Sequence, residues 1–157
     1  MSAATFAPWV EPIALRLEQS RRDIEQVARE IPEDAWENPS GYAGWSYKDQ
    51  LSHVSESHVG LHSVLGAILA GQDPDFSRFL RIDEINEQNR QKHLETPVAE
   101  LVASFTSASE ETESILSGLS AEDADLSLGP LTLGQALQGF AMHDTSHLEE
   151  LRKALPA

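Results

Sequence analysis

Apolar residues recur along this chain at the three- and four-residue intervals of amphipathic helices. No segment alternates apolar and polar side chains as a half-buried strand would, so the pattern predicts no β-strand. The predicted helices have the approximate bounds 12–30, 47–70, 76–94, 97–119 and 133–154. A helix of about 20 residues is about 30 Å long, and four of that length favour an all-α, antiparallel four-helix bundle with one additional short helix. The chain has no internal repeat or linker, so residues 1–157 are expected to form a single domain.

Local capping signals support these boundaries. A Ser or Thr followed three residues later by an acid or an amide is typical of a helix start, because each side chain can bond the other residue's backbone N–H. The pairs expected to act in this way are Ser46–Asp49, Thr132–Gln135 and Thr96–Glu100, the last with a spacing of four residues. Pro32 cannot continue the first helix, and Gly71 suits the end of the second. Residues 32–45, which contain the sequence NPSG, are predicted to form a loop.

Composition excludes several kinds of function. The chain has 157 residues and no cysteine, which excludes disulfides, iron–sulfur clusters and a cysteine nucleophile. Its formal net charge is −15, and because nucleic-acid binding relies on basic side chains that neutralise phosphates, we expect no nucleic-acid partner. The longest apolar-rich stretch, 64–70, is far shorter than the roughly 20 residues of a membrane-spanning helix. The N-terminal segment also lacks the basic and apolar regions of a signal peptide, so we expect a cytoplasmic protein without membrane association.

The candidate chemistry lies in the histidines, and first in those of the last predicted helix. His143 and His147 are four residues apart, which places two imidazoles on one helix face, near enough to share a metal ion. On a helical wheel His147 lies about 40° and His143 about 80° from the centre of the apolar stripe, so both face the bundle interior or its rim. Asp144 falls inside the apolar arc, where a carboxylate needs a hydrogen-bond partner or a neutralising charge. Two histidines four residues apart also occur by coincidence on helices that bind no metal. Without the glutamate of the zincin motif, this spacing alone is a weak signal of a metal site.

The second predicted helix offers further ligands. A metal site in a bundle takes ligands from facing helices, and this helix contains His53, His58 and His62. Periodicity places His58 and His62 within the apolar stripe and His53 about 120° from its centre, which favours His58 and His62 as the inward pair. A bundle helix touches two neighbours, however, so the side that carries His53 can also face the interior, and spacing leaves both alternatives open. His93 lies in a polar stretch and is expected at the surface.

Three segments resemble the motifs of a known family. Residues 44–53, GWSYKDQLSH, resemble the W-S-x-x-(D/E)-x-L-x-H start of the second helix in the DinB-like superfamily. Residues 143–152, HDTSHLEELR, resemble its last-helix motif, H-D-x-x-H-x-x-x-L-R. Residues 82–89, IDEINEQN, are similar to the D-x-x-N third-helix segment of relatives that include mycothiol-dependent maleylpyruvate isomerase. The motifs occur in the family's order, and the resemblance spans nearly the whole chain.

The resemblance implies a four-helix bundle that binds one divalent metal ion, typically nickel or zinc, through three histidines. By matching positions these are His53, His143 and His147, so the resemblance selects His53 over His58 and His62. The maleylpyruvate isomerase branch has Glu where this chain has His143. The all-His set resembles instead the hydrolase-like and bacillithiol-transferase-like branches, and it gives no reason to expect contact with DNA.

Three neutral histidines leave an open position on a divalent ion, which is typical of a catalytic site rather than a structural one. We therefore expect a metal-dependent enzyme, either a thiol-dependent S-transferase with a low-molecular-weight thiol as cosubstrate or a hydrolase. A non-catalytic metal-binding or stress-associated bundle is the alternative. Monomer and homodimer both fit the sequence.

The expected partner is a small-molecule substrate. Asp83, Asn86 and Asn89 of the polar third helix are available to contact it. Asp83, Glu56 and Asp144 are the candidates for a general base. Asp144 is also a candidate for orienting a ligand histidine from behind.

Overall fold

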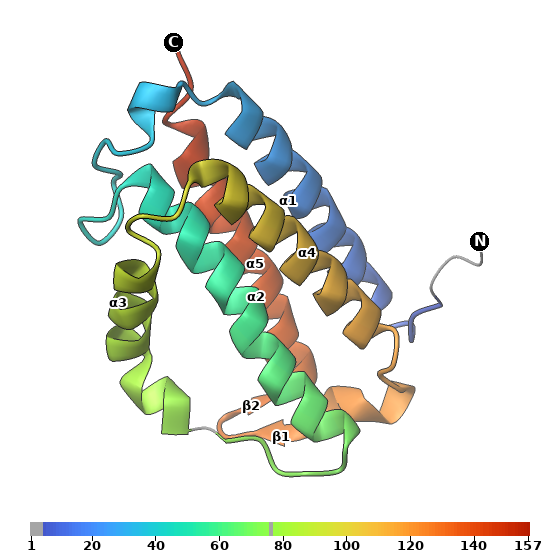
Figure 1. Ribbon diagram of the computed structural model, residues 1–157. Helices are drawn as coiled ribbons and strands as arrows, with labels where there is room; N and C mark the ends of the chain where they lie inside the picture. Colours follow the sequence, from blue (N-terminus) through green and yellow to red (C-terminus); the bar gives the residue numbers. More distant parts are fainter. Residues whose placement is uncertain (1–4, 76) are drawn as a thin grey trace.

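The computed structural model describes residues 5–75 and 77–157 and shows a mostly helical protein (Figure 1). Its α-helices are α1 (Glu11–Glu30), α2 (Tyr47–Leu69), α3 (Ile82–Lys92), α4 (Val98–Leu116) and α5 (Leu133–Arg152). Short 3-10 helices occupy Glu33–Ala35, Ser77–Arg81 and Ala121–Asp125, and a hairpin is formed by β1 (Ser127–Leu128) and β2 (Leu131–Thr132). Among the described residues, no helix has the length and apolar character needed to cross a membrane.

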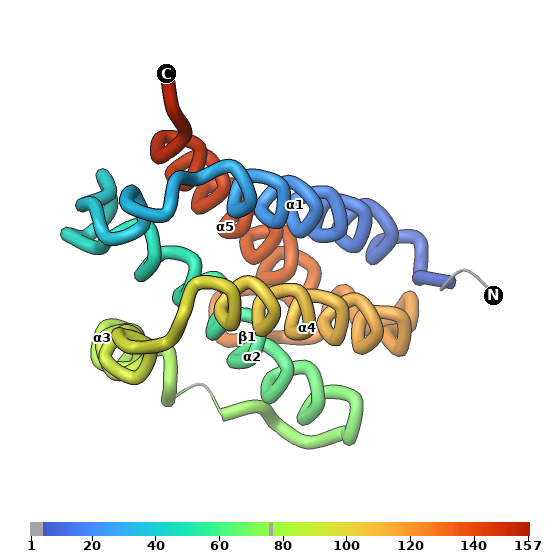
Figure 2. The backbone as a smooth tube through the Cα atoms, turned by 45° about the horizontal axis from the view of Figure 1, so that its top comes forward, coloured from blue at the N-terminus to red at the C-terminus, as the bar shows by residue number. Residues whose placement is uncertain are grey.

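Four helices form the bundle. α2 packs against α4 and α5, and α1 packs against the same two helices. α1 and α5 run in one direction and α2 and α4 in the other, so the sequence neighbours α1–α2 and α4–α5 are antiparallel (Figure 1). α3 is part of the connection between α2 and α4. It packs beside α2, outside the four helices of the bundle (Figure 2). The predicted helical bundle with one additional short helix is therefore confirmed.

Two predicted capping boxes form, and they set the starts of the two helices that carry the candidate histidines. At α2 the Asp49 backbone N–H donates to Ser46 Oγ at 3.1 Å, and the Ser46 N–H donates to Asp49 Oδ2 at 3.0 Å. At α5 the Gln135 N–H donates to Thr132 Oγ1 at 3.2 Å, and the Thr132 N–H donates to Gln135 Oε1 at 3.0 Å. Each box satisfies two N–H groups that a helix start otherwise leaves without partners.

The capping box predicted at Thr96 is wrong. α4 begins at Val98 with Pro97 at its cap position, and no side chain caps it. The Thr96 hydroxyl lies instead 3.2 Å from His93 Nδ1 and is used there. The predicted third helix is also too long: its start at Phe76 lies outside the described residues, and α3 begins only at Ile82, because Arg81 has a non-helical backbone.

The hairpin contradicts the prediction of no strand. Ser127 pairs with Thr132 and Leu128 with Leu131, across a turn in which Gly129 has a φ of 61°. Strands of two residues are too short to show the alternation from which a strand is predicted.

The bundle core consists of two apolar clusters with polar residues between them. One cluster includes Leu17, Leu65, Leu116 and Leu137, and the other includes Ile24, Leu51, Phe105 and Leu151. Between these clusters along α2, α4 and α5 lie His58, Thr112 and Asp144, whose exposed fraction is 0% in each case. A buried polar residue is tolerated only where it has hydrogen-bond partners. The side chains of this layer are paired with one another, so they must lie in a defined arrangement.

None of the residues of α3 is buried. Polar contacts at and just beyond its C-terminal end hold it against the bundle. Glu56 Oε1 on α2 accepts hydrogen bonds from His93 Nε2 at 2.6 Å and from Lys92 Nζ at 3.2 Å. Lys48 Nζ donates to the Leu94 carbonyl at 2.7 Å. His93, expected at the surface, is partly buried: 18% of its side chain is exposed, and it is bound to Glu56.

Candidate metal centre

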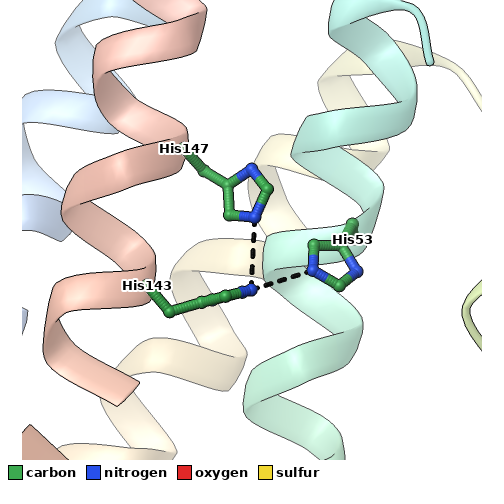
Figure 3. A group of neighbouring side chains, drawn as sticks. All are labelled: His53, His143 and His147. Atoms are coloured by element: carbon green, nitrogen blue, oxygen red, sulfur yellow. Dashed lines mark hydrogen bonds between the residues drawn. The ribbon is translucent and has the colours of Figure 1, made fainter. Parts of the chain in front are cut away.

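Three histidines meet where α2 packs against α5. His53 lies in the second turn of α2, and His143 and His147 lie one turn apart on α5. Their rings converge with the Nε2 atom of His143 between the other two, as Figure 3 shows. This atom is 2.9 Å from Nε2 of His53 and 3.2 Å from Nε2 of His147. The structure thus brings together the three residues that the family resemblance selected.

These distances fit a shared metal ion. Two nitrogen ligands about 2.1 Å from an ion lie about 3.0 Å apart at a right angle and about 3.4 Å apart at a tetrahedral angle. The observed separations of 2.9 and 3.2 Å lie close to this range. A proton on one Nε2 atom can be donated to only one neighbour, whereas a cation can be bound by all three lone pairs. The donor set therefore fits a divalent ion.

Gln50 fixes the orientation of His147 from behind. The Nδ1–H of His147 donates to Gln50 Oε1 at 2.8 Å, which leaves the lone pair on Nε2, the atom that faces the other histidines. The amide of Gln50 donates in turn to Ser40 Oγ at 2.7 Å, and Ser40 Oγ donates to the Trp45 carbonyl at 2.6 Å. Gln50 is fully buried. The sequence analysis missed it, although it lies three residues before His53 and so shares its helix face.

An aromatic loop covers the triad. The ring of Tyr42 lies 5.1 Å from that of His147, and the ring of Trp45 lies 5.0 Å from that of His53. The turn between the two aromatic residues uses left-handed backbone at Ala43 (φ 51°) and Gly44 (φ 73°). A positive φ is uncommon at an alanine, and such strain is concentrated at functional sites. The strained turn places both aromatic rings against the histidine cluster.

The environment keeps two of the histidines neutral. Burial, together with the charge of His143, lowers the pKa of His53 to about 4. The negative charge of Asp144 opposes this effect only in part. Burial also lowers the pKa of His147 to about 3, with the same help from His143 and from His53. Both imidazoles are therefore neutral near pH 7 and keep the lone pair that metal binding requires.

His58 and His62 face α4 and do not join the triad. Nδ1 of His58 lies 2.8 Å from Thr112 Oγ1, and its Nε2 lies 2.7 Å from Asp144 Oδ2. Nε2 of His62 lies 2.8 Å from the same Thr112 hydroxyl. Burial alone would raise the pKa of Asp144, but the neighbouring His143 and His58 more than offset this and lower it. Periodicity was thus right that His58 is an inward residue, whereas neither His58 nor His62 belongs to the group of three histidines that could hold a metal ion.

A cavity of about 520 Å³ adjoins the triad and is lined in part by His53 and His143. Most of its wall is apolar and comes from α2, α3 and α5, with Leu61, Val64, Ile85, Leu137 and Phe140 among the lining residues. The polar residues predicted to contact a substrate all line it: Asp83, Asn86 and Asn89. Glu56 lines it as well, whereas Asp144 is fully buried behind His143. Of the three candidate bases, only Asp83 and Glu56 can meet a ligand there.

Comparison with protein-family models matches residues 16–151 to the DinB superfamily. Comparison with curated proteins and with solved structures gives no match. The matched range includes α2 and α5, which supply all three histidines, and almost the whole bundle. The chain therefore belongs to the DinB superfamily.

Proposed function

We propose that this protein is a metal-dependent enzyme that uses one divalent ion, nickel or zinc, held by His53, His143 and His147. The proposed reaction is the transfer of a low-molecular-weight thiol to an electrophile, with hydrolysis of an ester or amide as the second candidate. The observation that carries the proposal is the convergence of three Nε2 atoms beside a cavity of about 520 Å³. A structural metal site would have no use for such a cavity, whereas a catalytic one needs it for a substrate.

The chain's own residues bind and orient the reactants. When bound, a divalent ion supplies Lewis acidity, which lowers the pKa of a thiol or water molecule at its open position. As neutral ligands, three histidines would leave the positive charge of the ion undiminished, and Gln50 holds the Nε2 lone pair of His147 toward the other two histidines. Tyr42 and Trp45 lie against the histidine rings and limit the access of water.

The cavity selects the second reactant. Its apolar wall favours a substrate with a hydrophobic body, and the amides of Asn86 and Asn89 are placed to hydrogen-bond its polar groups. The proton released by the thiol or water needs an acceptor in the same space. Glu56 is already bound by His93 and Lys92, so Asp83, which is exposed and lines the cavity, is the better candidate.

The test begins with metal content. Protein stripped with a chelator and reloaded with zinc or nickel is expected to hold one ion per chain by elemental analysis. His143→Ala is expected to lose it, whereas His93→Ala removes a histidine outside the triad and is expected to keep it. Thiol consumption is then measured with an aryl halide or epoxide, and product release with nitrophenyl esters. Metal binding without any metal-dependent turnover across these substrates would reject the enzyme and leave the non-catalytic bundle.

A further inference from the structure

A continuous chain of hydrogen bonds crosses the polar layer of the core and ends beside the candidate metal centre. It begins at His62, whose side chain is 15% exposed, and continues through Thr112 and His58 to Asp144, which are fully buried. The successive contacts are 2.8, 2.8 and 2.7 Å long. None of these four residues belongs to the histidine triad, and the proposed reaction assigns a role to none of them.

The chemistry of the groups sets the direction of the hydrogen bonds at the two ends of this series. The carboxylate of Asp144 only accepts, so the proton between it and His58 resides on Nε2 of His58. The other nitrogen of His58, Nδ1, lies 2.8 Å from the Thr112 hydroxyl, whose single proton is directed either to it or to the Ala108 carbonyl at 3.0 Å. His62 Nε2 lies 3.0 Å from the Ala108 carbonyl, which also only accepts, so His62 is the donor at this end and Thr112 can accept from it.

At the Asp144 end of this series of hydrogen bonds, two buried polar atoms have no hydrogen-bond partner. Oδ1 of Asp144 is buried and has no hydrogen-bond partner, and neither has the buried Nδ1 of His143. These two atoms face each other at 3.8 Å. A buried carboxylate oxygen without a donor is costly, and an imidazole N–H is the group that would relieve it.

We propose that His58 and Thr112 are positioning residues that hold Asp144 so that its free oxygen selects the tautomer of His143 with the proton on Nδ1. That tautomer leaves the lone pair of His143 on Nε2, the atom that faces His53 and His147. The inference rests on the proposed metal site, because the tautomer matters for binding a cation there. Stability alone does not explain the arrangement, since apolar residues of similar volume usually serve a core as well as buried polar and charged partners do.

The experiment compares two threonines that differ in their place in the chain. The hydroxyls of Thr112 and Thr145 both lie within hydrogen-bond distance of the carbonyl four residues earlier, at 3.0 and 3.2 Å, but only Thr112 contacts His58. The variants are Thr112→Val and, as matched control, Thr145→Val. His58→Leu removes the donor to Asp144 altogether, and Thr112→Val serves if that variant does not fold.

Two readouts are taken. Zinc affinity is measured by competition with a chromophoric chelator, and ring nitrogen chemical shifts of His143 are measured by NMR in the metal-free protein at pH 7.5. We expect the proton of His143 on Nδ1 in the wild type and a mixture of tautomers in Thr112→Val. We expect zinc affinity to fall about tenfold in His58→Leu and at least about threefold in Thr112→Val, since outer-sphere partners of this kind tune metal affinity. Thr145→Val should stay within about twofold of the wild type in affinity and keep its tautomer.

An unchanged tautomer of His143 in Thr112→Val, or zinc binding as tight as in Thr145→Val, would overturn the inference. If the wild type binds neither zinc nor nickel, the proposed function fails by itself. The ring shifts of the metal-free protein then decide this inference alone, because they do not depend on metal.

Discussion

Lowering the pH is expected to destabilise the metal-free protein through the histidine triad. In the folded chain the pKa of His53 is about 4 and that of His147 about 3, whereas the ordinary value is 6.5. Below pH 6.5 the unfolded chain therefore binds protons that the folded chain rejects. Stability rises with pH wherever the unfolded state binds more protons. The two histidines therefore contribute fully to the free energy of unfolding above pH 6.5. This contribution is lost progressively as the pH falls toward their pKa values in the folded chain.

The size of the effect follows from these pKa values. Between pH 7.5 and pH 5, a shift from 6.5 to about 4 or 3 removes about 2 kcal/mol of unfolding free energy for each histidine. The pair together removes about 4 kcal/mol, which is a large part of the roughly 5–15 kcal/mol that stabilises a typical domain. Acidic side chains have ordinary pKa values near 4 and mostly titrate below this window.

The assay is urea unfolding in the presence of a chelator at pH 7.5, 6.5, 5.5 and 5.0. The comparison is with the double variant His53→Gln/His147→Gln, because glutamine keeps a polar side chain that does not titrate. All other groups are common to both proteins, so the difference between the two pH profiles isolates the contribution of His53 and His147. Parallel profiles, with the wild type losing no more stability than the double variant, would refute the argument that burial holds these imidazoles neutral.

Three further outcomes are expected. His58→Leu should lower the free energy of unfolding by about 3–5 kcal/mol in urea titrations, because it leaves the buried Asp144 carboxylate without its partner; a loss below about 1 kcal/mol would contradict this. Val64→Trp should fill part of the cavity and raise the KM of any substrate found at least about tenfold, while elemental analysis still finds one ion per chain. Fluorescence anisotropy should detect no binding to duplex DNA at physiological salt, given a net charge of −15, and a submicromolar, salt-sensitive affinity would overturn that expectation.

The fold was predictable where its determinants are local. The capping boxes at Ser46 and Thr132 depend on residues three positions apart, and both form. The box expected at Thr96 does not form: Glu100 lies four positions after Thr96 rather than three, and the Thr96 hydroxyl lies beside His93 Nδ1 in the folded chain. Nothing in a local pattern reveals which of two available partners a threonine will use.

The site shows the same division between local and long-range information. The spacing of His143 and His147 is local and placed them correctly on one face of α5. The choice among the histidines of α2 is not local, because this helix has two inward sides, one toward α4 and one toward α5. His58 uses the first side and binds the Thr112 hydroxyl, while His53 uses the second and meets His143. Whether a histidine of α2 is buried and whether it lies at the candidate metal centre are therefore separate questions. Only the packing of α5 against α2 decides the second question.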